Sequence, residues 1–114
     1  MYSLLLVGDP RGLRWALEEG DNRVGRNPKG DGHRIAIGAD EVPEATTISR
    51  NHVIIGLRGG GAVVTRIADA NIVLLNGREI PEGAGPSELR AGDLLTLGSK
   101  KPHNRIGGAI LVGA

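Results

Sequence analysis

Glycine and proline break this chain into short apolar runs, and this restricts the folds open to it. Gly accounts for 19 of the 114 residues and Pro for 6. These residues interrupt nearly every stretch that could form an amphipathic helix, and the exception, 13–19, is itself short. Within the runs, apolar residues tend to recur at every second position, which is typical of half-buried strands. The sequence therefore predicts an all-β protein with no helix longer than about two turns.

The candidate strands follow one another at the spacing of a β-sandwich or barrel. In the central run, Val53, Ile55 and Leu57 share one face, and the glycines at 59–61 form a hairpin turn into the next run. Asn76-Gly77 is the strongest short hairpin signal in the chain. The pattern predicts about nine or ten strands, at 2–7, 13–17, 23–25, 35–37, 53–57, 62–67, 72–75, 94–97 and 110–112.

Composition excludes several classes of function. Lys and Arg total 14 and Asp and Glu 13, so the net charge of +1 argues against a nucleic-acid binder. Cys and Phe are absent, which excludes thiolate metal sites and disfavours base stacking. No apolar run approaches the roughly 20 residues of a membrane span. We expect a single domain over 1–114, a cytoplasmic location, no cofactor and no membrane partner. The chain ends soon after its last predicted strand, so it could be a domain cut from a longer protein.

Catalytic and metal-binding patterns are weak in this sequence. The histidines, His33, His52 and His103, show no ligand-like spacing, so we predict no metal site. Ser49, His52 and Asp69 could in principle form a hydrolase triad. However, Ser49 lacks the G-x-S-x-G elbow, and a serine three residues before its base is not a familiar triad arrangement. We therefore predict that the protein is not an enzyme.

A series of short motifs, each at a predicted strand end, is more specific than these isolated signals. The motifs are Gly25-Arg26, Ser49-Arg50-Asn51-His52, Asn71, Asn76-Gly77 and the segment Leu89–Gly98. In this order they resemble the forkhead-associated (FHA) domain, over about residues 2 to 112. The resemblance implies a two-sheet antiparallel β-sandwich of the FHA/SMAD-like type, with about eleven short strands. Its recognition loops would lie at one end, and we expect both termini at the other.

The resemblance also implies a function in signalling, namely binding of phosphothreonine peptides in protein–protein interactions. The partner would be a phosphothreonine-containing protein, the substrate of a Ser/Thr kinase. A phosphothreonine carries nearly two negative charges and three acceptor oxygens, so its receptor needs a forked cation and short donors. By resemblance, Arg26, Ser49 and Arg50 would hold the phosphate, and Asn71 would hydrogen-bond the peptide backbone.

The remaining motif residues would support this site rather than contact the ligand. By resemblance, His52 would brace the loops through a buried hydrogen bond. Gly25 has no side chain to obstruct the neighbouring Arg26, and Asn76 and Gly77 would shape an adjacent turn. We interpret Gly25, His52, Asn76 and Gly77 as structural residues of the site.

The sequence departs from the family pattern beside the phosphate site. Asn71 is followed by Ile72 and Val73, where the family usually has Asn-Gly-Thr, and Ala70 replaces a common Ser or Thr. One hydroxyl donor to the phosphate is therefore missing, and the wall facing the threonine methyl becomes more apolar. The stretch 27–48 is also longer than usual in the family. A second interpretation thus stays open: an FHA scaffold with a degenerate phosphate site that binds its partner without phosphate.

Overall fold

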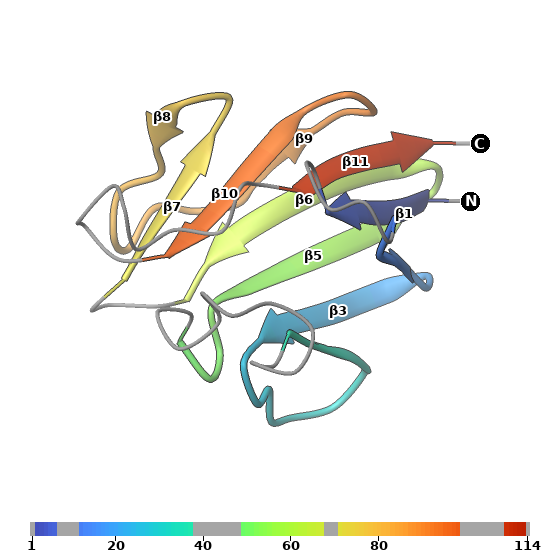
Figure 1. Ribbon diagram of the computed structural model, residues 1–114, viewed down its shortest axis with the longest axis horizontal. Helices are drawn as coiled ribbons and strands as arrows, with labels where there is room; N and C mark the ends of the chain where they lie inside the picture. The colour runs from blue at the N-terminus through green and yellow to red at the C-terminus, as the bar shows by residue number, and fades with distance from the viewer. Residues whose placement is uncertain (1, 7–11, 38–48, 68–70, 99–108, 114) are drawn as a thin grey trace.

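The computed structural model describes residues 2–6, 12–37, 49–67, 71–98 and 109–113, which form a sandwich of two sheets (Figure 1). The strands are β1 (Tyr2–Leu6), β2 (Arg14–Ala16), β3 (Gly20–Gly25), β4 (His33–Ala36), β5 (Val53–Arg58), β6 (Gly61–Arg66), β7 (Ile72–Leu75), β8 (Arg78–Glu79), β9 (Ser87–Leu89), β10 (Leu94–Gly98) and β11 (Ala109–Gly113). One sheet has the order β2-β1-β11-β10-β7-β8 and the other β4-β3-β5-β6-β9. The predicted all-β sandwich is confirmed.

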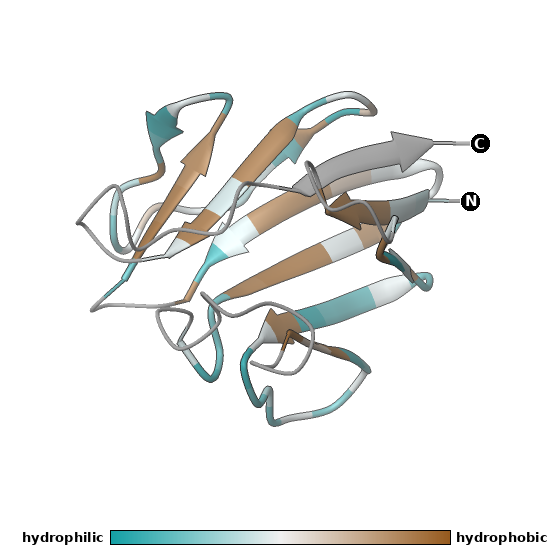
Figure 2. Ribbon diagram, viewed as in Figure 1, coloured by the Kyte–Doolittle hydropathy of each residue, from teal (hydrophilic) through white to brown (hydrophobic). Residues whose placement is uncertain are grey.

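Alternating apolar residues from both sheets build the core. Ile55 of β5 pairs with Val64 of β6, and both are fully buried. Val73 and Leu95 from the other sheet belong to the same buried cluster. Figure 2 shows the apolar residues along β5, β7 and β10. Each fully buried aliphatic side chain stabilises the fold by about 1.5–3 kcal/mol. Because successive side chains of a strand point to opposite faces, burial of one face explains why apolar residues alternate in the sequence.

Among the described strands, one pairing is parallel and the others are antiparallel. β4 runs parallel to β3, with Asn22 opposite His33. The connecting loop contains Gly30 at φ 114° and Gly32 at φ 93°, a backbone region that glycine enters at little cost. These glycines let the chain loop back to the start of β3 and run along it in the same direction. In the described part of the chain, no helix is long and apolar enough to cross a membrane.

The strand directions gather three chain segments at one end of the sandwich. β3 ends at Gly25, while β5 begins at Val53 and β7 at Ile72, and these strand ends lie at the same side of the molecule (Figure 1). The start of β1 and the end of β11, which pair with each other, lie at the opposite side, where Figure 1 marks the N- and C-termini.

Candidate functional site

The end of β3 lies directly against the segment that precedes β5. The backbone N–H of Arg26 donates to the carbonyl oxygen of Ser49 at 3.0 Å, and that of Asn27 donates to Arg50 at 3.2 Å. A Cβ atom on Gly25 would collide with the carbonyl oxygen of Arg50. Gly25 is therefore required for this close approach of two backbones, which fixes Arg26 beside Ser49.

His52 joins this segment to the start of β7. Its side chain is fully buried, and its Nδ1 accepts a hydrogen bond from the backbone N–H of Ser49 at 3.1 Å. Nε2 therefore carries the proton of the neutral ring and donates to the carbonyl oxygen of Ile72 at 2.9 Å. Burial lowers the pKa of His52, and the charge of Arg66 lowers it further, against the opposing effect of the Ile72 carbonyl. The ring thus bridges the two segments as a neutral imidazole.

Ser49 and Asn71 meet through their side chains. The Nδ2 of Asn71 donates to the Oγ of Ser49 at 2.9 Å. Since Oγ accepts this bond, the serine hydroxyl can donate its proton to a further acceptor, as a phosphate contact requires. The His52 ring contacts the main chain of Ser49 and not its hydroxyl, so this arrangement differs from a nucleophile and its base. Asp69, together with Ala70 and His103, lies outside the described residues.

Arg26 and Arg50 bring positive charge to this end of the molecule. Both residues are exposed, and the backbone bonds described above hold their main chains together. Lys29 is tied to the same place because its backbone N–H donates to the Oδ1 of Asn51 at 2.8 Å. The structure brings together Arg26, Ser49, Arg50 and Asn71. We refer to these four residues as the phosphate cluster, after the role that the resemblance implies for them.

Arg66, which the sequence analysis did not single out, fastens Asn71 from the inside of the fold. Its side chain is only 2% exposed and forms an ion pair with Glu79 at 3.2 Å. Its guanidinium donates to the carbonyl oxygen of Asn71 at 2.8 Å and to that of Ile80 at 2.6 Å. The available signal was the period of β6, whose inward positions are Ala62, Val64 and then this arginine. A charged residue in the place of a core residue calls for buried partners.

Asn76 and Gly77 lie at the other end of β7, about 15 Å along the strand from Asn71. Both have positive φ, 51° and 84°, as a type I′ hairpin requires. The Asn76 side chain donates to Asp93 at 3.0 Å and accepts from the backbone N–H of Leu94 at 2.9 Å. These residues join the β7–β8 turn to the start of β10. The structure does not bring them to the phosphate cluster.

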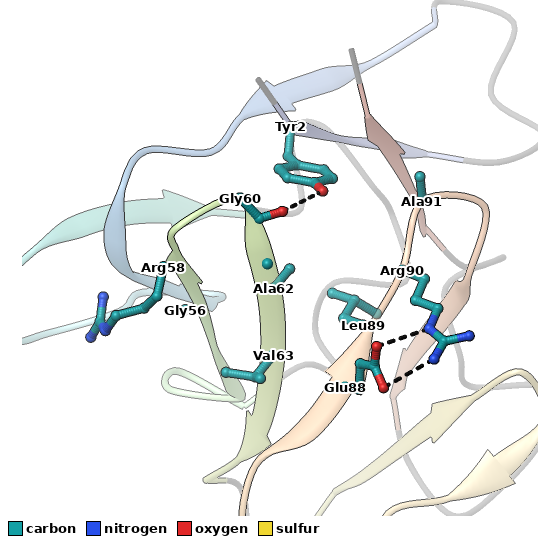
Figure 3. Close-up of a pocket in the computed structure, with 11 residues that line it drawn as sticks. Tyr2, Gly56, Arg58, Gly60, Ala62, Val63, Glu88, Leu89, Arg90 and Ala91 are labelled. Carbon is teal, nitrogen blue, oxygen red and sulfur yellow. Dashed lines mark hydrogen bonds and ion pairs between the residues drawn. The ribbon is translucent and has the colours of Figure 1, made fainter.

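A cavity among the described residues is also remote from the phosphate cluster. It has a volume of about 460 Å³ and lies beside the β5–β6 hairpin and β9 (Figure 3). The Tyr2 hydroxyl donates to the carbonyl oxygen of Gly60 at one side, and Glu88 and Arg90 form an ion pair at the other. Of the described residues that line it, none belongs to the cluster.

The burial of Ile72 contradicts the expectation that its side chain forms part of the wall facing the threonine methyl. Ile72 is only 2% exposed. Its side chain therefore offers little surface to a ligand, although the sequence suggested that it forms part of a wall facing the threonine methyl. Its carbonyl oxygen, bonded to His52, is the atom that links it to the site.

Comparison with known proteins identifies the family. The FHA domain model matches residues 22–98, whereas no curated protein sequence matches the chain. The structure of full-length yeast Pml1p is 32% identical at a TM-score of 0.72, with 98% of this chain and 81% of that chain covered. The N-terminal FHA domain of S. cerevisiae Rad53p, in complex with a phosphothreonine peptide, is 18% identical at a TM-score of 0.72, covering 99% and 93%.

A bacterial structure has the same fold. The FHA domain of the CT664 protein from Chlamydia trachomatis is 23% identical at a TM-score of 0.70, with 99% of this chain and 97% of that chain covered. The family match spans more than half of the sequence. It begins within β3, ends with β10 and contains all four residues of the phosphate cluster. On this evidence, the chain belongs to the FHA domain family.

Proposed function

We propose that this chain is a phosphothreonine-peptide binding module that mediates phosphorylation-dependent protein–protein interaction. The observation that carries the proposal is the hydrogen-bonded arrangement of the phosphate cluster. Three segments far apart in the sequence meet there, through the Arg26–Ser49 backbone bond and the Asn71–Ser49 side-chain bond.

The chemistry of the cluster suits a phosphorylated side chain. Arg26 and Arg50 supply forked cations that can each donate two parallel bonds to phosphate oxygens. Ser49 supplies a short hydroxyl donor on a segment held by the buried His52. The side-chain amide of Asn71 keeps its second Nδ2 proton and its Oδ1 for hydrogen bonds to the backbone of an extended peptide. The Rad53p domain, a structural relative, was solved with a phosphothreonine peptide, which supports the same class of ligand here.

An oriented peptide library tests the proposal. We expect a library with fixed phosphothreonine to be enriched on the immobilised domain, and the same library with unmodified threonine not to be. The Arg26→Ala variant is the control for the site, and it should lose the enrichment. Equal retention of both libraries by the parent protein would reject the proposal.

The second candidate is a scaffold that recognises its partner without phosphate. It is favoured by two departures from the family pattern: Ala70 replaces a common Ser or Thr, and Ile72 begins the pair that replaces the Gly-Thr that usually follows Asn71. The yeast relative Pml1 is described as a splicing factor integrated into the RES complex, which is compatible with an FHA domain acting inside an assembly. Phosphate-independent capture of one peptide class in the unmodified library would favour this candidate.

A further inference from the structure

We infer that Arg66 is a positioning residue of the peptide-binding site, which fixes the main chain of Asn71 and thereby the direction of its side-chain amide. The inference rests on the proposed function insofar as Asn71 contacts a peptide. The structural part of it, that Arg66 holds Asn71 in place, can be tested in the protein without ligand.

Two buried side chains donate hydrogen bonds to the start of β7: His52, which directly precedes β5, and Arg66, the last residue of β6. His52 donates to the carbonyl oxygen of Ile72 at 2.9 Å, and Arg66 donates to that of Asn71 at 2.8 Å. Consecutive carbonyl groups of one segment are thus fixed from the interior. A residue whose own main chain is fixed can present its side chain in one direction, and Asn71 directs its Nδ2 to the Oγ of Ser49 at 2.9 Å.

Burial separates the role of Arg66 from that of the surface arginines. Its side chain is 2% exposed, so it has almost no surface with which to meet a ligand, whereas Arg26 and Arg50 are exposed. A buried guanidinium is retained only where several acceptors compensate for its lost hydration. The carbonyl oxygens of Asn71 and Ile80 are two such acceptors.

Glu79 provides a matched control within the same contact network. It pairs with Arg66 at 3.2 Å, but its own side chain is 53% exposed. A substitution of Glu79→Gln removes the negative charge and keeps the shape, while the carbonyl of Asn71 retains its donor. Partly exposed ion pairs contribute little to stability. If the Asn71 contact is what matters, this control should leave the site unchanged.

Replacement of the guanidinium should loosen Asn71 and weaken binding without altering the charge contact with phosphate. We expect Arg66→Met to weaken binding of a phosphothreonine peptide by roughly 10- to 150-fold, as for loss of a hydrogen bond to a charged group. The salt dependence of the affinity should match that of the parent, because Arg66 does not touch the phosphate. Arg26→Ala should instead flatten the salt dependence. Glu79→Gln should change the affinity less than twofold.

The experiment combines two measurements at a temperature at which each variant is folded. Nuclear magnetic resonance of the ligand-free protein follows the side-chain amide of Asn71, and calorimetric titration at two salt concentrations gives the affinities. Arg66→Lys is the second variant, because it keeps a buried cation if Arg66→Met fails to fold. We expect the Asn71 amide signals to shift in both Arg66 variants and to stay in place in Glu79→Gln.

Each outcome decides the inference. Unchanged Asn71 signals in the Arg66 variants would overturn it, as would an equal loss of affinity in Glu79→Gln. A parent protein that binds no phosphothreonine peptide would refute the proposed function. In that case, shifted Asn71 signals in Arg66→Lys would still support the positioning of Asn71 by Arg66, and unshifted signals would reject both.

Discussion

At the scale of single residues, the candidate site separates side chains that are exposed to solvent from side chains that hold the loops. Arg26 and Arg50 are exposed, whereas His52 is fully buried and bonded at both ring nitrogens. Ser49 belongs to both groups, since its backbone N–H binds His52 and its hydroxyl binds Asn71. Substitutions at these residues should therefore affect either affinity or stability, and seldom both equally.

Arg26→Ala should remove a principal phosphate contact. We expect a loss of roughly 2–4 kcal/mol in the free energy of phosphopeptide binding, because a charged fork is lost. The free energy of unfolding should change by less than about 0.5 kcal/mol, since the residue is exposed. Titration calorimetry and urea unfolding measure the two quantities. An Arg26→Ala protein with the parent's affinity would show that the phosphate site has been assigned wrongly.

Ser49→Ala and His52→Ala should give opposite phenotypes. Ser49→Ala removes a hydroxyl donor and should weaken peptide binding by about 1–2 kcal/mol, with a smaller effect on unfolding. His52→Ala leaves a cavity and two unpaired groups, the Ser49 N–H and the Ile72 carbonyl, and should lower the free energy of unfolding by about 3 kcal/mol. Thermal unfolding and titration of both variants would show the contrast, and a reversed pattern would contradict this division of roles.

The state of His52 predicts how stability varies with pH. Because burial lowers the pKa of His52 from its ordinary 6.5, the unfolded chain takes up a proton at this residue at a higher pH than the folded chain does. Its contribution is therefore complete above about pH 6.5 and is lost as the pH falls towards the folded-state pKa, by up to about 1.4 kcal/mol per pH unit.

Urea unfolding at pH 7.5, 6.5 and 5.5 measures this effect, with His52→Gln as the control. The control should have a flatter dependence over this range. The Asp93 carboxylate, whose pKa is lowered mainly by the Arg90 backbone N–H, acts separately. Its contribution is lost only in acid, below its ordinary 3.8. If His52→Gln and the parent lose stability in parallel between pH 7.5 and 5.5, His52 is not the group responsible.

At the scale of strands and loops, the site depends on how closely β3 approaches the segment before β5. Gly25 permits this approach, and a Cβ atom there would meet the main chain of Arg50. Gly25→Ala should push the segment 49–51 away, lower the free energy of unfolding by more than about 2 kcal/mol and abolish phosphopeptide binding. Gly85→Ala is the matched control, because a Cβ atom at Gly85 would meet nothing within 4 Å.

Chemical denaturation and peptide titration of the two alanine variants provide the measurement. Gly85→Ala should keep the parent's affinity and nearly its stability. Equal stability and affinity of the two variants would contradict this prediction. Such a result would mean that the segment 49–51 can move away at little cost, and that the short distance between the backbones is not needed for peptide binding.

The sequence predicted most strands because their alternation reflects the core directly, as in the pairing of Ile55 with Val64. The pattern missed β8 and β9. β8 has two exposed charged residues, Arg78 and Glu79, and owes its place to the Asn76-Gly77 turn. β9 has three residues, of which only Leu89 is buried, which is too short a run to show an alternation. The parallel pairing of β4 with β3 could not be predicted, because the residue pattern of a strand does not determine whether it runs parallel or antiparallel to its neighbour. It depends on the loop that ends at Gly32.

The site itself was predictable in part. Each short motif alone is weak, and it was their order along the chain, which resembles that of the FHA family, that predicted Arg26, Ser49, Arg50 and Asn71 as binding residues. Arg66 could not be assigned to the site from the sequence, because it reaches the site through the main-chain carbonyl group of Asn71, and every residue has such a group. Such contacts depend on the meeting of β6 with the start of β7, a long-range feature of the fold.

At the scale of the whole molecule, the proposed binding site and the two ends of the chain lie on opposite sides. The phosphate cluster lies where β3 ends and β5 and β7 begin, whereas the start of β1 and the end of β11 pair at the far side (Figure 1). A partner bound at the cluster would thus approach one end of the sandwich without covering β1 or β11. The binding energy then comes from a small contact area, in which the phosphate charge has a large share, and this makes affinity sensitive to salt.

The affinities of three matched peptides should separate the contribution of the phosphate charge from that of the threonine methyl group. We expect affinity to fall in the order phosphothreonine, phosphoserine and unmodified threonine. One buried methyl group contributes about 0.8 kcal/mol, so phosphothreonine should bind about fourfold more tightly than phosphoserine. The buried Ile72 offers little surface to that methyl, so the contact must come mainly from the neighbourhood of Ser49 and Asn71. Raising the salt concentration should weaken both phosphopeptides in parallel and leave their ratio unchanged, because the methyl contributes no charge. Titration of the three peptides at two salt concentrations measures all of this. A ratio that collapses with salt would mean that the discrimination between threonine and serine is electrostatic and not a methyl contact.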